Sequence, residues 1–141
     1  MILGFRTSPA ILAYVNGREV ERYSQVGVVT PDHTIRTKNW PVVLPAPDAA
    51  DLTAFRTGAA AAIERFAARY HAYFAKHNQR QDPPKVELDP IPRVMLVPGV
   101  GLFGAGASAS AAKIAADIAE STVQTIADGF RIGDGLDRTL G

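Results

Sequence analysis

The sequence contains no cysteine. This absence excludes disulfide bonds, thiolate nucleophiles and cysteine-ligated zinc, and it favours a reducing compartment, for which the cytoplasm is the default. An excess of charge of one sign is also lacking, because 15 Lys and Arg residues offset 14 Asp and Glu residues to give a formal net charge of +1. Because positive and negative charges nearly cancel, the chain as a whole is not attracted to nucleic acid or anionic lipid, and we expect no nucleic-acid partner.

Long hydrophobic runs are missing too. No stretch reaches the roughly 20 apolar residues needed to cross a bilayer, so no membrane partner is expected. The first 13 residues include Arg6 and Pro9 and lack the long hydrophobic region and cleavage site of a signal peptide. With 141 residues, 47% of them hydrophobic and 21% charged, the chain is predicted to form a single domain over residues 1–141 around one core.

Three helices are indicated by caps and by apolar spacing. Ser8 before Pro9 is typical of a helix start and predicts a helix of two turns. The strongest periodic signal predicts a long amphipathic helix from about Asp51 to about His77. Ser108 or Ser110 is predicted to cap a last helix that ends near Gly129, before a tail over 130–141 that is expected to fray. A short helical segment is also expected within 18–24.

Strands are indicated in two places. Val42 to Leu44, bracketed by prolines, predicts a brief edge strand. The run 93–97 predicts a buried strand, and the Pro-Gly turn after it is expected to return the chain as Leu102-Phe103, forming a β-hairpin. The predicted fold class is therefore α/β or α+β: a small sheet with a hairpin, packed by the long helix and a C-terminal helix.

The glycines of this turn also match a nucleotide-binding pattern. Gly99, Gly101 and Gly104 follow the G-x-G-x-x-G spacing after a strand. In that fingerprint a helix opens within the glycine run and faces the pyrophosphate, whereas here Leu102-Phe103 is predicted to be a strand and Ala105-Gly106-Ala107 delays the helix. We therefore favour a hairpin turn and keep NAD binding as an alternative.

The densest polar cluster lies in residues 30–38. It combines the carboxylate of Asp32, the imidazole of His33 and the cations of Arg36 and Lys38. Such a loop could hold a phosphate or carboxylate through Arg36 and Lys38, with His33 as a proton donor. The alternative is that Asp32 caps a turn while the cations are solvated or paired.

Other titratable residues give weaker signals. His71 and His77 are six residues apart on the long helix, which places them on nearly opposite sides and excludes the i, i+4 pair of a zinc helix. The sequence contains no nucleophile elbow, P-loop or H-x-H motif. The sequence therefore predicts no catalytic residue and no metal ligand.

Two segments carry a resemblance to a known family. Residues 8–38 contain TPDH followed by RTK, and residues 92–118 contain PRVMLVPGVGLF and an AKIA run. With the long Ala/Tyr-rich helix between them, they resemble the region between the two enzymatic halves of fused class II aldolase and short-chain dehydrogenase proteins. That family includes rhamnulose-phosphate aldolase and lactaldehyde dehydrogenase fusions.

The resemblance implies a setting in rhamnose metabolism. A zinc-binding aldolase half would precede this region and an NAD(P)-dependent dehydrogenase half would follow it, so that both cofactors and both active centres lie in these partner domains and none in this chain. The segment 98–106, PGVGLFGAG, is similar to a part of class II aldolases in which a histidine before Gly-Leu binds zinc. Val100 stands at that place and has no lone pair to offer, which implies a degenerate aldolase-like unit.

The residues and the family resemblance together leave three possible functions. The first is a structural, interdomain role in a bifunctional carbohydrate enzyme, with which a homo-oligomer is compatible. The second is a sugar-phosphate site around His33, Arg36 and Lys38. The third is NAD binding through the glycines of the turn.

Overall fold

The described residues form a four-stranded sheet. The computed structural model describes residues 1–25, 38 and 40–132. Its strands are β1 (Ile2–Arg6), β2 (Val42–Val43), β3 (Val94–Val97) and β4 (Gly101–Gly106). They lie in the order β1-β4-β3-β2, in which β1 and β3 run antiparallel to β4 and β2 runs parallel to β3. β1 and β2 are therefore the edges of the sheet.

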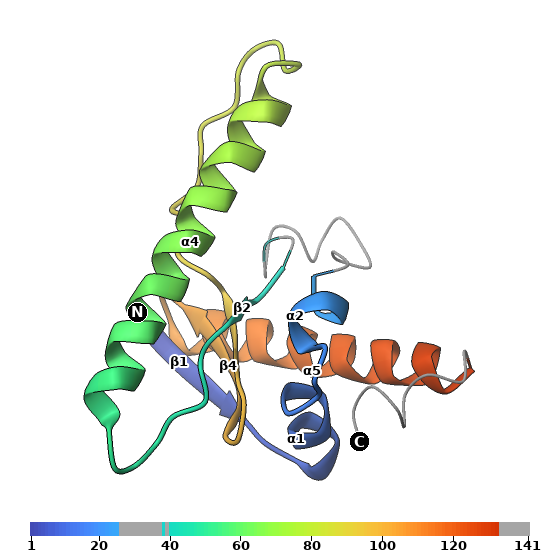
Figure 1. The fold of residues 1–141 in the computed structure, drawn as a ribbon. Helices are drawn as coiled ribbons and strands as arrows, with labels where there is room; N and C mark the ends of the chain where they lie inside the picture. Colours follow the sequence, from blue (N-terminus) through green and yellow to red (C-terminus); the bar gives the residue numbers. More distant parts are fainter. Residues whose placement is uncertain (26–37, 39, 133–141) are drawn as a thin grey trace.

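Helices cover both faces of this sheet. They are α1 (Pro9–Val15), α2 (Val20–Tyr23), α4 (Leu52–Asn78) and α5 (Ala109–Ile132). α5 lies along one face together with α1 and α2, and α4 packs on the other, its C-terminal end extending well beyond the strands (Figure 1). No helix among the described residues is long and apolar enough to span a membrane.

The two faces of the sheet carry separate apolar clusters because strand side chains alternate. Val94 and Leu96 of β3 join the cluster beneath α1, α2 and α5, and Val97 joins the one beneath α4. The first cluster contains Ile11, Tyr14, Val15, Val20, Tyr23, Val94, Leu96, Leu102, Ala119 and Val123. The second contains Val42, Leu44, Ala62, Phe66 and Val97, with Trp40, Phe55 and Tyr70 among the half-buried residues around it.

The predicted helix starts are confirmed. The Ser8 hydroxyl accepts a hydrogen bond from the amide of Ile11 at 3.1 Å, and Pro9 is the first helical residue of α1. The Asp51 carboxylate caps α4 in the same way. Ser108 accepts from the amide of Ala111 at 3.1 Å at the start of α5. Each cap satisfies an amide that has no partner within the helix.

The predicted hairpin is also confirmed. β3 and β4 are antiparallel neighbours, and the turn between them is closed by a hydrogen bond from the amide of Val100 to the carbonyl of Val97. Gly99 has a φ of 81°, a conformation that glycine adopts without strain. Fold class and hairpin together therefore agree with the sequence-based prediction.

Three details differ from the prediction. β1 was not predicted, because Ile2 to Arg6 is a short run interrupted by Gly4 and shows its strand character only by pairing with β4. The last helix continues to Ile132, beyond the expected end near Gly129. Residues 130–132 are thus helical rather than part of a frayed tail, and residues 133–141 lie outside the described part of the chain.

Candidate functional site

The polar loop predicted from the sequence is described at one position only. Asp32, His33 and Arg36 lie outside the described residues. Lys38 is described, and its side chain is only 4% exposed. Its φ of 61° lies in the left-handed region, which few residues other than glycine and asparagine adopt. Tertiary contacts must therefore hold this backbone conformation in place.

Those contacts surround the ammonium group of Lys38. Its Nζ donates a hydrogen bond to the carbonyl of Asp89, lies 3.9 Å from the Asp89 carboxylate and stands 4.1 Å from the centre of the Tyr70 ring. Burial lowers the pKa of Lys38 to about 8, and the carboxylate of Asp89 offsets this effect only in part. Through these contacts, Lys38 connects the segment before β2 with α4 and with the loop that precedes β3.

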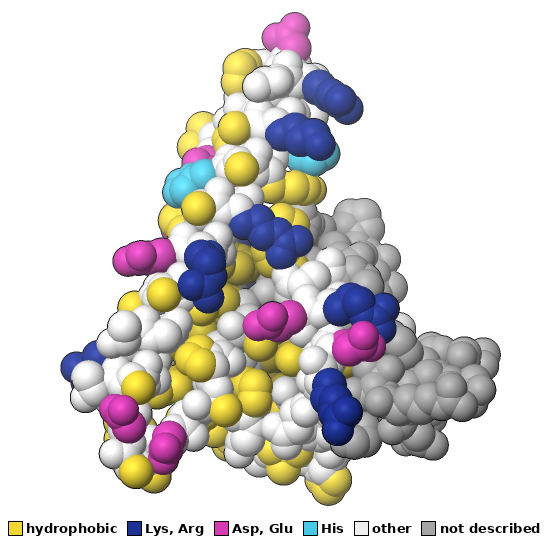
Figure 2. All heavy atoms as spheres, in the orientation of Figure 1, with side chains coloured by type: hydrophobic (Ala, Val, Ile, Leu, Met, Phe, Trp, Pro, Cys, Tyr) yellow, Lys and Arg dark blue, Asp and Glu magenta, His cyan; other side chains and the backbone are white. Residues whose placement is uncertain are grey.

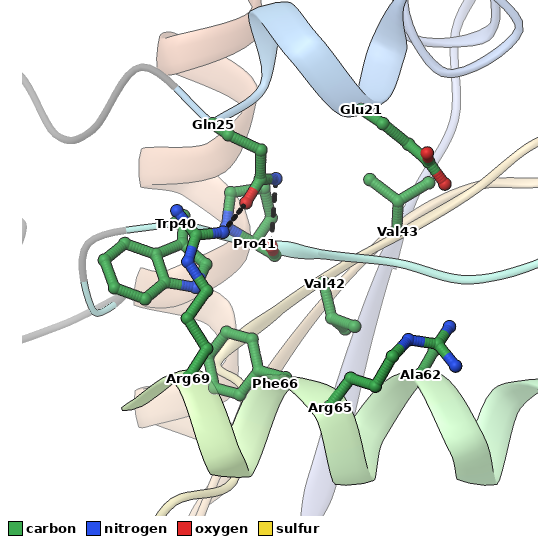
Figure 3. Close-up of a pocket in the computed structure, with 10 residues that line it drawn as sticks. All are labelled: Glu21, Gln25, Trp40, Pro41, Val42, Val43, Ala62, Arg65, Phe66 and Arg69. Atoms are coloured by element: carbon green, nitrogen blue, oxygen red, sulfur yellow. Dashed lines mark hydrogen bonds between the residues drawn. The ribbon is translucent and has the colours of Figure 1, made fainter. Parts of the chain in front are cut away.

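A polar hollow among the described residues lies nearby, between α2 and α4. It is a cavity of about 270 Å³ whose floor is the segment leading into β2 (Figure 3). Figure 2 shows Lys and Arg side chains along α4 beside this hollow, an acidic side chain across from them and apolar atoms within it. The lining residues are Glu21, Gln25, Trp40, Pro41, Val42, Val43, Ala62, Arg65, Phe66 and Arg69.

One end of the cavity is organised around Arg69. Its guanidinium carbon lies 3.8 Å from the centre of the Trp40 ring, and its Nη1 donates a 2.6 Å hydrogen bond to the side-chain oxygen of Gln25. The Gln25 side-chain nitrogen in turn donates to the carbonyl of Pro41 at 3.2 Å. Residues from two other segments thus hold Arg69 in one orientation (Figure 3).

The other end of the cavity carries Arg65 and Glu21. The two side chains extend into the hollow from opposite sides, Arg65 from α4 and Glu21 from α2 (Figure 3). Arg65 makes no hydrogen bond or ion pair with any described residue, whereas a second basic group, Arg22, is paired with Glu19. The cavity therefore presents one guanidinium whose donors all remain available.

The indole of Trp40 lines the same cavity. Its Nε1 is buried and has no hydrogen-bond partner in the described part of the chain. A buried N–H group without a partner is unusual and calls for an explanation. The guanidinium groups of Arg65 and Arg69, which line the cavity, suit an oxygen acceptor.

Sequence reasoning placed Arg65 and Arg69 on α4 but did not identify them as site residues. Their i, i+4 spacing was the available signal, because it puts two cations on one side of a helix. That spacing alone is common on solvated helix faces. Only the fold brings Gln25 and Trp40 to the same place.

The glycines of the β3–β4 turn do not provide a nucleotide cradle. A Cβ atom built on Gly104 would lie 2.4 Å from the backbone nitrogen of Ala116, so this glycine lets β4 and α5 pack closely. α5 begins at Ala109, after β4 has ended, and therefore does not open within the glycine run. The residues present do not fit the pyrophosphate of NAD(P) in the way the alternative requires.

Zinc is not accommodated by the described residues either. They include no group of three or more His, Asp or Glu side chains that could hold a metal ion. Nδ1 of His71 lies 2.5 Å from a carboxylate oxygen of Glu87, and the ring of His77 packs against Tyr73. Val100, at the position of the resembled histidine ligand, packs at the margin of the core beneath α4.

Comparison with known proteins identifies a relative and a family of the chain. The chain is 30% identical over 115 residues to a Bacillus subtilis (strain 168) protein named "Uncharacterized oxidoreductase YuxG", a match that covers 81% of this chain and 16% of that protein. The matched part is thus about one sixth of the relative's length. No solved structure matches the chain. The family described as "Aldolase class II, second domain" matches residues 1–134, and the chain therefore belongs to that family.

Proposed function

We propose that the chain serves as a non-catalytic, interdomain unit of a longer enzyme that also contains a class II aldolase part and an oxidoreductase part. Membership in a family of second domains supports this proposal. So does the relative named as an oxidoreductase, because most of its length lies outside the matched region and leaves room for other domains. In its finer form, the proposal is a cytoplasmic fusion with a short-chain dehydrogenase that acts in rhamnose metabolism.

The observation that carries the proposal is an apolar strip on the sheet, formed by Leu3, Phe5 and Phe103. Leu3 and Phe5 are 54% and 47% exposed, although they belong to a strand of the central sheet. Phe5 lies beside Phe103 with ring centroids 5.0 Å apart, on the face opposite α5. Phe103 is half-buried, and an apolar strip with two exposed side chains beside it is typical of a surface that another domain covers.

An interdomain role also implies where the cofactors of the longer enzyme would bind. The zinc and NAD(P) that the family resemblance implies would belong to the aldolase and oxidoreductase parts. The described residues of this chain do not fit either group, and no step of either reaction is assigned to them.

Two measurements test the proposal. The purified chain should neither cleave sugar phosphates in the presence of zinc nor reduce NAD(P) with sugar-derived aldehydes or alcohols, while its circular dichroism shows folded helices. Turnover of either kind by the pure chain would contradict the non-catalytic assignment. Independently, the complete reading frame around the coding segment should contain aldolase and oxidoreductase sequences.

Hydrogen exchange tests the interdomain role directly. Amides of residues 1–6 should exchange more slowly in the complete polypeptide than in this chain alone, because a neighbouring domain covers the apolar strip. Amides of α5 near Ala116, which are already packed against β4, serve as the internal control. Equal exchange of β1 in both proteins would show that the strip is not an interdomain contact.

A further inference from the structure

We propose that the cavity between α2 and α4 binds a small hydroxylated carboxylate, with the carboxylate group at Arg65 and hydroxyl groups toward Glu21 and toward the end of the cavity that holds Arg69. This site goes beyond the interdomain role and does not depend on it. The binding would take place in this chain itself, at residues that are all described.

The charge of the lining favours a monoanion. Arg65 and Arg69 contribute two positive charges and Glu21 one negative charge, so a ligand with a single negative charge neutralises the cavity. A zwitterion would leave one positive charge uncompensated, and a phosphate monoester, with a charge near −2, would leave a negative one. A ligand with one carboxylate and neutral hydroxyl groups carries this single negative charge.

The geometry of the donors favours a planar anion. The stack on Trp40 and the hydrogen bond to Gln25 hold the Arg69 guanidinium in place, so little conformational entropy is lost when it binds a ligand. Arg65, four residues earlier on the same helix, has all its donors available. Guanidinium groups bind carboxylates through paired N–H···O bonds, which are among the stronger hydrogen bonds in proteins.

The other residues that line the cavity indicate which groups the ligand carries besides its carboxylate. Glu21 stands across the cavity from Arg65 and can accept hydrogen bonds from hydroxyl groups. Val42, Val43, Pro41 and Ala62 add apolar surface between the polar ends. A volume of about 270 Å³ lies just below the usual range for small-molecule pockets and therefore suits only a compact ligand.

A simpler arrangement competes with this proposal. Arg65 and Glu21 could swing together into an ion pair and fill the cavity without any ligand. Such a pair would be solvent-exposed and therefore worth little free energy, so a bound carboxylate could displace it. The two arrangements predict opposite responses to added carboxylates.

Trp40 provides a local probe because it is the only tryptophan in the chain. Its fluorescence should be titrated with D-gluconate, with sorbitol and with inorganic phosphate, at constant ionic strength and pH 7. Gluconate should give a saturable change, sorbitol none, and phosphate a weaker response because it cannot reach Glu21. No saturable change with gluconate, or equal responses to gluconate and sorbitol, would overturn the proposal.

Variants assign the effect to named residues. Arg65→Gln should weaken gluconate binding at least tenfold, because a charge-assisted bond is lost. Arg56→Gln removes the same charge from the same helix at an exposed position outside the lining, and should leave binding unchanged. An equal loss in both variants would indicate general charge attraction and would contradict the site.

Glu21→Ala distinguishes the contacts of the hydroxyl groups from those of the carboxylate. It should weaken gluconate binding but strengthen phosphate binding, because it removes both a hydroxyl acceptor and a negative charge. Unchanged gluconate binding would show that Glu21 does not hold the hydroxyl groups. Circular dichroism of each variant confirms that a change in binding is not a loss of folding.

Discussion

The guanidinium of Arg69 lies 3.8 Å from the centre of the Trp40 ring and shields part of this single tryptophan. Through its hydrogen bond to Gln25, Arg69 also joins α4 to the end of α2. A stacked cation of this kind contributes only about 0.5–1 kcal/mol at a partly exposed site. Its larger effect is to order one wall of the cavity.

Arg69→Met should therefore expose Trp40 to solvent. We expect faster quenching of tryptophan fluorescence by acrylamide, because the planar group that covers the indole and its bond to Gln25 are both lost. The loss of stability should stay below about 1 kcal/mol. Arg56→Met is the matched control on the same helix, and quenching that rises equally in both variants would contradict the stacked arrangement.

Gly104→Ala should destabilise the protein. The added methyl group would lie 2.4 Å from the nitrogen of Ala116 and 2.6 Å from the oxygen of Ala112, so β4 and α5 must separate. A cost of about 1–3 kcal/mol in the free energy of unfolding is expected from urea titration. Gly4→Ala, where the nearest atom is 3.4 Å away, should cost clearly less. Similar costs at both positions would argue against the tight contact.

Lys38 should make stability depend on pH in the alkaline range. Its pKa is about 8 in the folded protein and 10.5 in the reference state, so the unfolded chain binds more protons between these values. The free energy of unfolding should therefore rise as pH increases from about 8 toward 10, by at most about 3 kcal/mol in total.

Lys38→Met tests this dependence by difference. The rise attributable to Lys38 should disappear in the variant, while contributions from Tyr14 and Tyr23, whose pKa values burial raises, are common to both proteins and cancel. Parallel stability curves for the two proteins between pH 7.5 and 9.5 would show that Lys38 is not desolvated.

Two leucines on paired strands should respond differently to truncation. Leu102 is fully buried in the core beneath α5, and Leu102→Ala should cost about 2–5 kcal/mol in the free energy of unfolding. Leu3 is 54% exposed on the apolar strip, and Leu3→Ala should cost about 0.5 kcal/mol or less in the chain alone. In the complete polypeptide its cost should increase, because the strip is then covered. Chemical denaturation of both proteins checks this comparison.

Elements with local signals could be predicted from the sequence. The Ser8-Pro9 start of α1, the Asp51 cap of α4 and the glycine turn after β3 all depend on residues within four positions of one another. β1 could not be predicted in this way, since its partner strand pairs Ile2 with Gly106, a residue distant in the sequence. A short strand with exposed apolar residues resembles an irregular segment until that partner is known.

The candidate site also combines residues that the sequence pointed to with residues that only the fold brings to them. Of the polar loop, only Lys38 is described, and its ammonium contacts Asp89 and Tyr70, which the sequence did not connect with it. The sequence showed Arg65 and Arg69 as two cations on one helix. It did not show that Gln25 and Trp40 lie beside them, and without these neighbours the pair could not be told from two solvated side chains.

The sequence by itself determined where helices begin, where the chain turns and that a long helix lies between the strands, because capping, glycine conformation and hydrophobic spacing act over a few residues. Only the tertiary structure decided that β1 completes the sheet, that Lys38 is buried and that a cavity lined by two guanidinium groups opens between α2 and α4. These features depend on contacts between segments distant in sequence, whose free energies arise only when packing brings them together.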